Sequence, residues 1–222
     1  IVMSHLVSSR PAPARLAVPA LVAAAACWGL GTVASKQVVD DISPLTLLPL
    51  QLTASCLFLL GLSLVRHDRF AWSPQLRRLA GLGVLNPGVA YALGLVGLTT
   101  ITASMYVLLW ATEPVVILVL ATLVLREHVS PRLAAGVAVA VLGVVFVVYQ
   151  PGAAGAATGV TLTLVSVGFC AAYTVLTRRL LLDDASLTVA LVQQVAALTF
   201  AVLLATGVAL VGGTGWDLAG HS

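Results

Sequence analysis

The amino-acid sequence predicts an all-α protein, a polytopic bundle of membrane-spanning helices, and three observations support this prediction. Of the 222 residues, 60% are hydrophobic and only 9% are charged, whereas about 25% of a typical soluble domain is charged. The apolar residues gather in runs of about 20, the length that a helix needs to cross a bilayer core of about 30 Å. Most charged residues lie in the breaks between these runs. This composition excludes a soluble globular enzyme, a disordered chain and a nucleic-acid-binding domain.

Seven apolar runs are long enough to be spans. They are Leu16–Val38, Ser43–Val65, Leu79–Leu98, Thr100–Leu125, Arg132–Tyr149, Gly159–Leu180 and Leu187–Val211. The breaks between them contain prolines, glycines and charges, which are turn signals. A strand of an outer-membrane barrel would alternate polar and apolar residues, and runs such as Val137–Val148 do not alternate. Each run is therefore expected to form a helix.

The basic residues indicate how the chain is oriented in the membrane. With the N-terminus inside, 10 of the 11 Lys and Arg residues fall on the cytoplasmic side, and only Lys36 falls outside. The positive-inside rule favours this arrangement. We therefore expect residues 1–15 to form a cytoplasmic tail of a multi-pass protein of the cell (cytoplasmic or inner) membrane. The basic residues then mark topology, and no nucleic-acid partner is expected.

Two segments of the chain resemble each other at a shift of 142 residues. Across Ala20–Leu60, eight of 41 aligned pairs are identical, whereas apolar bias alone would give about four. The polar matches carry most weight because polar residues are rare here, and they include Gln51 with Gln193. We expect a first five-helix repeat over residues 16–150 and the start of a second over residues 156–222.

An odd number of helices per repeat makes the second copy enter the membrane from the opposite side. Inverted repeats of this kind are typical of secondary transporters, whose substrate site lies near the bilayer midplane where the repeats meet. Residue 222 aligns with residue 80 of the first copy. The sequence therefore predicts a truncated chain with about seven of ten helices, whose complete form would be roughly 70 residues longer.

Glu113 is the only acidic residue well inside a predicted span. A carboxylate there costs several kcal/mol unless it is protonated, paired or hydrated, so an intramembrane acid indicates a functional site. Glu113 is a candidate for proton exchange or for pairing with a cationic substrate, and the alternative is a protonated side chain that bonds a neighbouring helix. Pro114 follows it and removes a backbone hydrogen bond, which predicts a kink beside the carboxylate.

Aromatic residues precede Glu113 on the same face of its predicted helix. Thr102, Tyr106, Trp110 and Glu113 lie at offsets of 0, 4, 8 and 11 residues, and residues spaced in this way share one helix face. Trp110 and Tyr106 are therefore candidates to line a pocket for an amphipathic or cationic solute, helped by cation–π contacts. Trp28 of the first span is a further lining candidate. Aromatic packing between helices is the alternative.

Other polar and kink-forming residues also lie in the predicted spans. Asn86 and Pro87 interrupt the third span, where they would serve gating or ligand contact, or simply a structural kink. Gln51 and Gln193 occupy equivalent places in the two repeats, and Tyr173 lies in the sixth span. These side chains are binding candidates as well, and interhelical hydrogen bonding is the alternative for the glutamines.

The remaining chemically active residues point to structural roles. Glu127 ends the fourth span and Arg132 begins the fifth, so we expect a structural or gating salt bridge there rather than substrate contact. The three cysteines, Cys27, Cys56 and Cys170, lie in apolar runs without metal-ligand spacing. The four histidines lie in predicted loops or tails. No metal, cofactor or enzymatic activity is therefore expected.

The middle of the chain resembles a known domain. Tyr106–Val148 reads YVLLWATEPVVILVLATLVLREHVSPRLAAGVAVAVLGVVFVV. This stretch resembles the fourth and fifth helices of an EamA domain, from the drug/metabolite transporter superfamily. The matching features are the mid-helix Pro114, Glu127 at the cytoplasmic end, a Ser-Pro-Arg restart and a glycine-spaced next helix. The Trp-Gly pair at Trp28, with Lys36 after it, is similar to the opening helix of the family.

The resemblance implies ten helices in two inverted five-helix repeats, and the movement of small metabolites or toxic compounds. Glu113 is not general to the family, and the family does not define the substrate. We therefore expect a secondary transporter that works by alternating access, with efflux as the favoured direction. The alternative is a non-transporting membrane scaffold or assembly protein. The expected partners are the lipid bilayer and a small-molecule substrate, and homodimer formation is left open.

Overall fold

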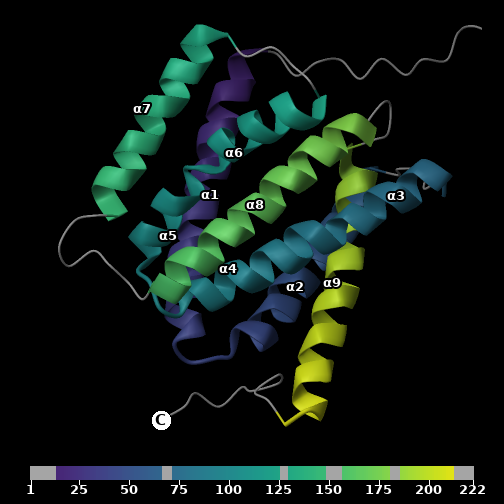
Figure 1. The fold of residues 1–222 in the computed structure, drawn as a ribbon. Coiled ribbons are helices and arrows are strands. Elements are labelled where there is room, and N and C mark those ends of the chain that lie inside the picture. The colour runs from purple at the N-terminus through teal and green to yellow at the C-terminus, as the bar shows by residue number, and fades with distance from the viewer. Residues whose placement is uncertain (1–13, 67–71, 126–129, 149–156, 181–185, 213–222) are drawn as a thin grey trace, which may run out of the picture.

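The structure is a computed structural model that describes residues 14–66, 72–125, 130–148, 157–180 and 186–212. Within these ranges the chain forms helices joined by short connections, and they gather in one bundle (Figure 1). The helices are α1 (Ala14–Val39), α2 (Pro44–Arg66), α3 (Pro74–Gly83), α4 (Ala90–Leu98), α5 (Ala103–Trp110), α6 (Glu113–Leu120), α7 (Pro131–Val148), α8 (Ala157–Leu180) and α9 (Ser186–Leu210). Two π-helical segments are η1 (Val84–Val89) and η2 (Ala121–Leu125). The predicted all-α bundle is confirmed.

Two of the spans are broken helices. The third span consists of α3, η1 and α4, and it breaks at Asn86, whose backbone angles (φ −146°, ψ 122°) are not helical. The fourth span consists of α5, α6 and η2, and it breaks at residues 111–112. Pro87 and Pro114 lie beside these breaks because proline has no N–H with which to continue the helical ladder.

Six helical stretches within the described residues are long and apolar enough to cross a membrane. They are Val18–Val39, Pro44–Arg66, Pro74–Leu98, Ala103–Leu123, Ala157–Leu180 and Leu187–Leu210. They coincide with six of the seven predicted spans. The fifth predicted span is also helical, as α7, but its apolar stretch, Ala134–Gly143, is shorter than the others. The chain is therefore a multi-pass membrane protein.

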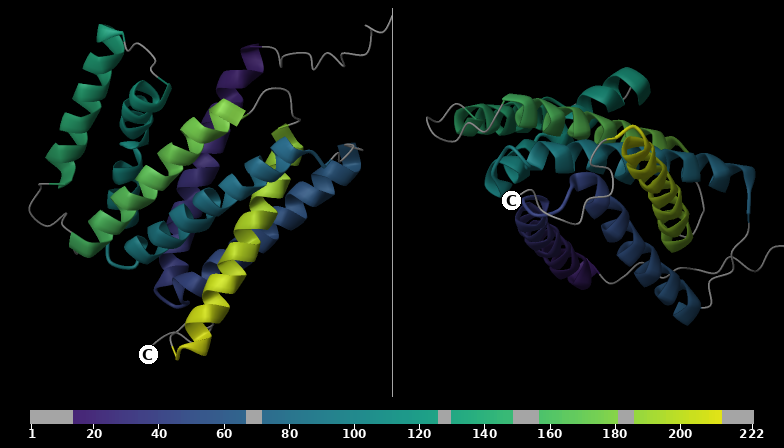
Figure 2. Two further views of the ribbon diagram at one scale, coloured as in Figure 1. Left: turned by 45° about the vertical axis from the view of Figure 1, so that its right-hand side comes forward. Right: turned by 90° about the horizontal axis from the view of Figure 1, so that it is seen from below.

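Small residues bring the helices into close contact. Helix α8 packs along α4, and α9 packs along α2 and α3, as Figure 2 shows. A Cβ atom added to Gly97 in α4 would lie 2.6 Å from Oγ1 of Thr163 in α8, and Gly159 is equally confined by α4. Gly83 in α3 lies against the backbone of Gln193 in α9. Such contacts suit a membrane, where van der Waals packing rather than water exclusion holds helices together.

The two ends of the bundle differ in charge. The end of α2, the start of α3, the start of α7 and the end of α8 all lie toward the upper end of the bundle in Figure 1. There the Gln75 side chain in α3 donates a hydrogen bond to the carbonyl of Leu180, the last residue of α8. The described arginines of these helix ends are Arg66, Arg77, Arg78, Arg132, Arg178 and Arg179. Lys36 lies near the other end of α1.

Two glutamines that align at the shift of 142 residues join corresponding pairs of helices. Gln51 in α2 donates to Ser35 of α1 at 2.9 Å, whereas Gln193 in α9 accepts from Tyr173 of α8 at 2.8 Å. Ser35 aligns with Thr177 and not with Tyr173, so the two contacts differ in partner and direction. The repeat and its inverted arrangement stay predictions.

Candidate functional site

A cavity of about 230 Å³ lies between helices α1, α2, α4 and α5. Its lining consists of Trp28, Gly31, Thr32, Ser35, Gln51, Tyr91, Leu95, Leu98, Tyr106 and Trp110. Four lining residues are candidates from the sequence, namely Trp28, Gln51, Tyr106 and Trp110. The fold therefore brings side chains from separate spans to one place.

Aromatic rings surround Trp110 on three sides. The ring of Trp28 lies 6.0 Å from it with an interplanar angle of 68°, and the ring of Tyr91 lies 6.3 Å away at 89°. Tyr106 is 6.0 Å away at 49°. Edge-to-face arrangements at these distances are favourable because the positive ring edge meets a negative ring face. Trp110 and Tyr106 are buried, while Trp28 is 40% exposed. The first two rings are therefore enclosed by their neighbours, and the ring of Trp28 is accessible.

Helix α5 positions two of these rings one turn apart. It begins after Thr102, whose hydroxyl accepts the Met105 N–H at 3.2 Å and so caps the helix. Thr102 does not line the cavity, contrary to the shared face predicted for it, because capping holds its side chain against its own backbone. A Cβ on Gly94 in α4 would lie 2.5 Å from the Tyr106 hydroxyl. Glycine at this position therefore makes room for Tyr106.

The opposite wall of the cavity is polar. The Gln51 side-chain amide donates to Oγ of Ser35 at 2.9 Å, and Ser35 Oγ donates to the Gly31 carbonyl at 2.8 Å. The Thr32 hydroxyl donates to the Trp28 carbonyl at 3.0 Å. Both hydroxyl protons are thus used within α1, as is common for Ser and Thr inside helices. Ser35 and Gln51 join α1 to α2 along this wall.

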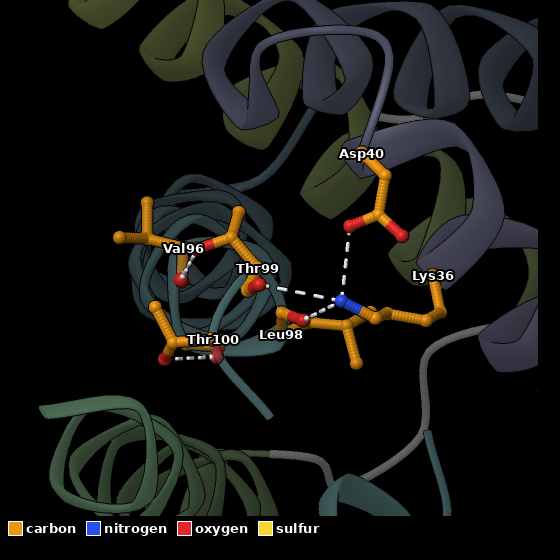
Figure 3. A network of polar contacts seen from close by, with 7 residues as sticks. Lys36, Asp40, Val96, Leu98, Thr99 and Thr100 are labelled. Atoms are coloured by element: carbon orange, nitrogen blue, oxygen red, sulfur yellow. Dashed lines mark hydrogen bonds and ion pairs between the residues drawn. The ribbon is translucent and has the colours of Figure 1, made fainter. Parts of the chain in front are cut away.

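Lys36 holds the end of α4 against α1, as Figure 3 shows. Its Nζ donates to the carbonyls of Leu98 at 3.1 Å and Thr99 at 3.3 Å, and it pairs with Asp40 at 3.0 Å. The last carbonyls of a helix lack intrahelical partners, and a cation there is stabilising. Because Leu98 also lines the cavity, this contact fixes one end of the cavity wall. The sequence showed Lys36 as the exception to the charge rule and as part of the family resemblance, and its spacing to Asp40 was an available signal for the ion pair.

Glu113 lies beside the cavity and not in its lining. It is the first residue of α6 and is partly buried, and its Oε1 accepts a hydrogen bond from the Cys170 thiol of α8 at 3.2 Å. A turn at residues 111–112 separates α5 from α6, and Trp110 lines the cavity whereas Glu113 is not among its lining residues. Tyr91, a lining residue, is close enough to Glu113 and Cys170 for electrostatic interaction. Cys170, expected to be only a small buried residue, therefore has a polar partner.

Among the residues that the structure describes, the side chains that line the cavity include no Asp, Glu, Lys or Arg. The described lining is therefore aromatic on one side and hydrogen-bonding on the other.

The other predicted binding residues lie away from the cavity. The Tyr173 hydroxyl donates to Gln193 Oε1 at 2.8 Å, and the Gln193 amide donates to the Leu79 carbonyl at 3.2 Å. These bonds join α8, α9 and α3, which is the interhelical role considered for the glutamines. Asn86 and Pro87 form the break in the third span, and the Asn86 Oδ1 atom is buried without a partner among the described residues. None of these residues lines the cavity.

The predicted salt bridge of the fourth connection lies outside the described residues. Glu127 belongs to residues 126–129, which the structure does not describe, and Arg132 is exposed near the start of α7. Their pairing stays a prediction.

Six lining residues were missed as binding candidates from the sequence, and three of them carry hydroxyl groups, namely Thr32, Ser35 and Tyr91. Thr32 and Ser35 follow Trp28 at offsets of 4 and 7 residues, so the spacing of one helix face could have identified them. Tyr91 lies just after the break at Asn86. Whether its ring lies beside the cavity depends on how α4 crosses α5. No local pattern encodes that crossing.

Comparison with known proteins gives two matches. Residues 15–149 match the model of the EamA-like transporter family. A protein of Archaeoglobus fulgidus, named an uncharacterized transporter, is 28% identical over 155 residues, which cover 69% of this chain and 54% of that protein. The chain thus spans about half the length of the curated relative it matches. No solved structure matches the chain.

Proposed function

Because the chain belongs to the EamA-like transporter family, we propose that it acts as a secondary transporter that exports small metabolites or amphiphilic, toxic compounds across the cytoplasmic membrane. The observation that carries this proposal is the cavity between α1, α2, α4 and α5, which combines aromatic rings with a hydrogen-bonding wall. Concave, largely apolar sites with a few placed polar groups are typical of small-molecule binding. The name of the Archaeoglobus fulgidus relative points to transport in general.

Transport would proceed by alternating access, in which the two repeats move relative to each other, while the described lining of the cavity belongs to the first repeat. Discontinuous membrane helices near the midplane are typical of such proteins, and the third and fourth spans are both broken. The N-terminus would face the cytoplasm, since the described arginines of the helix ends gather toward one end of the bundle. The Lys36 contact with α4 would then lie at the outer end.

Glu113 would serve as the proton or cation site of the transport cycle. An ionisable side chain inside a membrane span is costly and is usually kept for function. Its carboxylate accepts a hydrogen bond from Cys170 in α8, which belongs to the second predicted repeat. Glu113 itself belongs to the first predicted repeat. A change in its protonation would therefore act on a contact between the two repeats.

The proposal predicts that Glu113→Gln removes most of the pH dependence of solute flux. The full gene product would be reconstituted into liposomes, and efflux of a panel of small solutes would be measured with and without a pH gradient. The amide cannot exchange a proton, so the flux of the variant should no longer respond to the gradient. Asp41→Asn makes the same acid-to-amide change at an exposed connection and should keep the native response.

Unchanged pH dependence in Glu113→Gln would remove Glu113 from the mechanism. The absence of flux for the whole panel in the native protein, together with recovery of a stable protein partner by cross-linking, would instead favour a membrane scaffold.

A further inference from the structure

A second pocket, of about 490 Å³, lies between the start of α3 and the end of α8. Two arginines line it, Arg78 from α3 and Arg179 from α8, and both are exposed. The rest of the described lining consists of Ser73, Pro74, Gln75 and Leu180. Among the described residues, none lines both this pocket and the cavity between α1, α2, α4 and α5. The pocket is therefore a separate site, and both charges in its described lining are positive.

Hydrogen bonds hold the walls of this pocket together. The Gln75 side chain of α3 donates to the Leu180 carbonyl at the end of α8. The Ser73 hydroxyl accepts the Leu76 N–H at 3.0 Å and so caps α3. A hydroxyl that accepts one bond can still donate its own hydrogen. Both helices therefore contribute hydrogen-bond donors to the pocket, the guanidinium groups foremost.

Paired arginines at the end of a membrane bundle suit a phosphate group. A guanidinium is always charged, and its planar fork donates two parallel hydrogen bonds to phosphate oxygens. Basic pockets between membrane helices are known to hold the head groups of anionic lipids. Acidic residues also occur in the neighbouring connections, but residues 66–78 and 178–184 together contain six arginines and three aspartates. The charge around the pocket therefore favours an anion.

An apolar groove lies next to this pocket along the chain. It is lined by Trp72 together with residues from the membrane-spanning parts of α2 and α9, namely Cys56, Leu57, Leu60, Leu191, Val192 and Val195. Trp72 directly precedes Ser73 of the pocket. Tryptophan is enriched at membrane–water interfaces, where its ring sits at the level of the lipid head groups. A molecule with a phosphate head and an apolar chain therefore fits this end of the bundle better than a free phosphate ion.

We propose that the pocket between α3 and α8 binds the phosphate of an anionic membrane lipid, whose acyl chain lies against the apolar groove. The phosphate contacts Arg78 and Arg179. Because α3 belongs to the first predicted repeat and α8 to the second, the bound lipid joins the two repeats at this end of the bundle. The inference goes beyond the proposed function and does not depend on which solute is carried.

Lipids of different charge test this inference on the full gene product. The protein would be stripped of lipid in an uncharged detergent and titrated with dioleoyl phosphatidylglycerol or dioleoyl phosphatidylcholine, and native mass spectrometry would count the bound lipid. The two lipids share their acyl chains and a phosphate, and only the first has a net charge. We expect phosphatidylglycerol to bind at least about tenfold more tightly, since two arginines face its charge. An excess of inorganic phosphate should not displace it, because the free ion lacks the chain.

Equal binding of the two lipids would overturn the inference. Displacement of phosphatidylglycerol by inorganic phosphate would overturn it as well, because the pocket would then be a site for the free ion. These outcomes need no variant, so they do not depend on whether a substituted protein folds. They are also separate from the proposed function, which is judged by solute flux.

Arg78→Gln and Arg179→Gln locate the binding site. Each change removes one charge from the pocket, so the affinity for phosphatidylglycerol should fall about fivefold in either variant. Arg77→Gln is the matched control, because Arg77 is exposed and directly precedes Arg78 in α3 but does not line the pocket. Its affinity should stay near the native value. Native affinity in both folded pocket variants, or an equal loss in Arg77→Gln, would contradict the assigned site.

Discussion

Gly83→Ala is expected to lower the free energy of unfolding by about 1–3 kcal/mol, the usual cost of overpacking. A Cβ at this position would lie 2.7 Å from the Cα of Gln193, and a backbone atom cannot swing aside as a side chain can. Helices α3 and α9 would therefore have to separate. Unfolding of the purified protein by titration with SDS would measure the change.

Gly81→Ala is the matched control for this prediction. Gly81 lies two residues earlier in the same helix, and a Cβ there meets nothing within 4 Å. Alanine is the better helix former by about 0.5–1 kcal/mol, so this variant should equal or exceed the native stability. Equal stability of the two variants would contradict the close contact between α3 and α9.

Gln193→Leu is expected to destabilise the protein by about 1–2 kcal/mol, which is at the upper end for interhelical hydrogen bonds in membrane proteins. Gln193 is buried and joins Tyr173 of α8 to the Leu79 carbonyl of α3. Leucine breaks both bonds and leaves the Tyr173 hydroxyl without this acceptor. The same SDS titration would measure the loss.

The neighbouring glutamine should respond in the opposite direction. The Oε1 atom of Gln194 is buried without a partner among the described residues, and a buried unpaired polar atom is itself costly. Gln194→Leu removes that atom, so the stability should stay the same or rise. A larger loss in Gln194→Leu than in Gln193→Leu would show that the Gln193 bonds do not hold the three helices together.

The helices of this protein could be predicted from its sequence because the bilayer imposes a simple requirement. A span must be apolar for about 20 residues and must satisfy its own backbone hydrogen bonds. The predicted run Ser43–Val65 and the observed α2 (Pro44–Arg66) therefore differ by one residue at each end. The fifth predicted span, Arg132–Tyr149, likewise corresponds to α7 (Pro131–Val148).

The cavity could be predicted only in part. Trp110 and Tyr106 were identifiable because one helical turn separates them within α5. Ser35 and Tyr91 join them only through packing between helices, such as the close contact of Gly94 in α4 with Tyr106 in α5. Such packing is decided by side-chain shape between helices, and a single sequence does not display it.

The position of Glu113 shows where helical periodicity fails. A continuous helix would place Glu113 on the same face as Trp110. The sequence does not show how the break before Pro114 changes the position of Glu113. In the structure the carboxylate accepts a hydrogen bond from the Cys170 thiol and is not among the lining residues. The separation of the carboxylate from the cavity lining therefore came from the structure alone.

Flux through a blocked cavity tests the central claim most directly. Gly31 lines the cavity, and a Cβ there meets nothing within 4 Å, so Gly31→Leu would fill the cavity without disturbing α1. Gly29→Leu is the control, because Gly29 is equally uncrowded but does not line the cavity. In liposomes that contain the full gene product, efflux of the solutes that the native protein transports should fall at least about tenfold in Gly31→Leu, the effect of losing some 1.4 kcal/mol of binding. Efflux should stay at the native rate in Gly29→Leu. Native efflux in a folded Gly31→Leu protein would show that the solute takes another path.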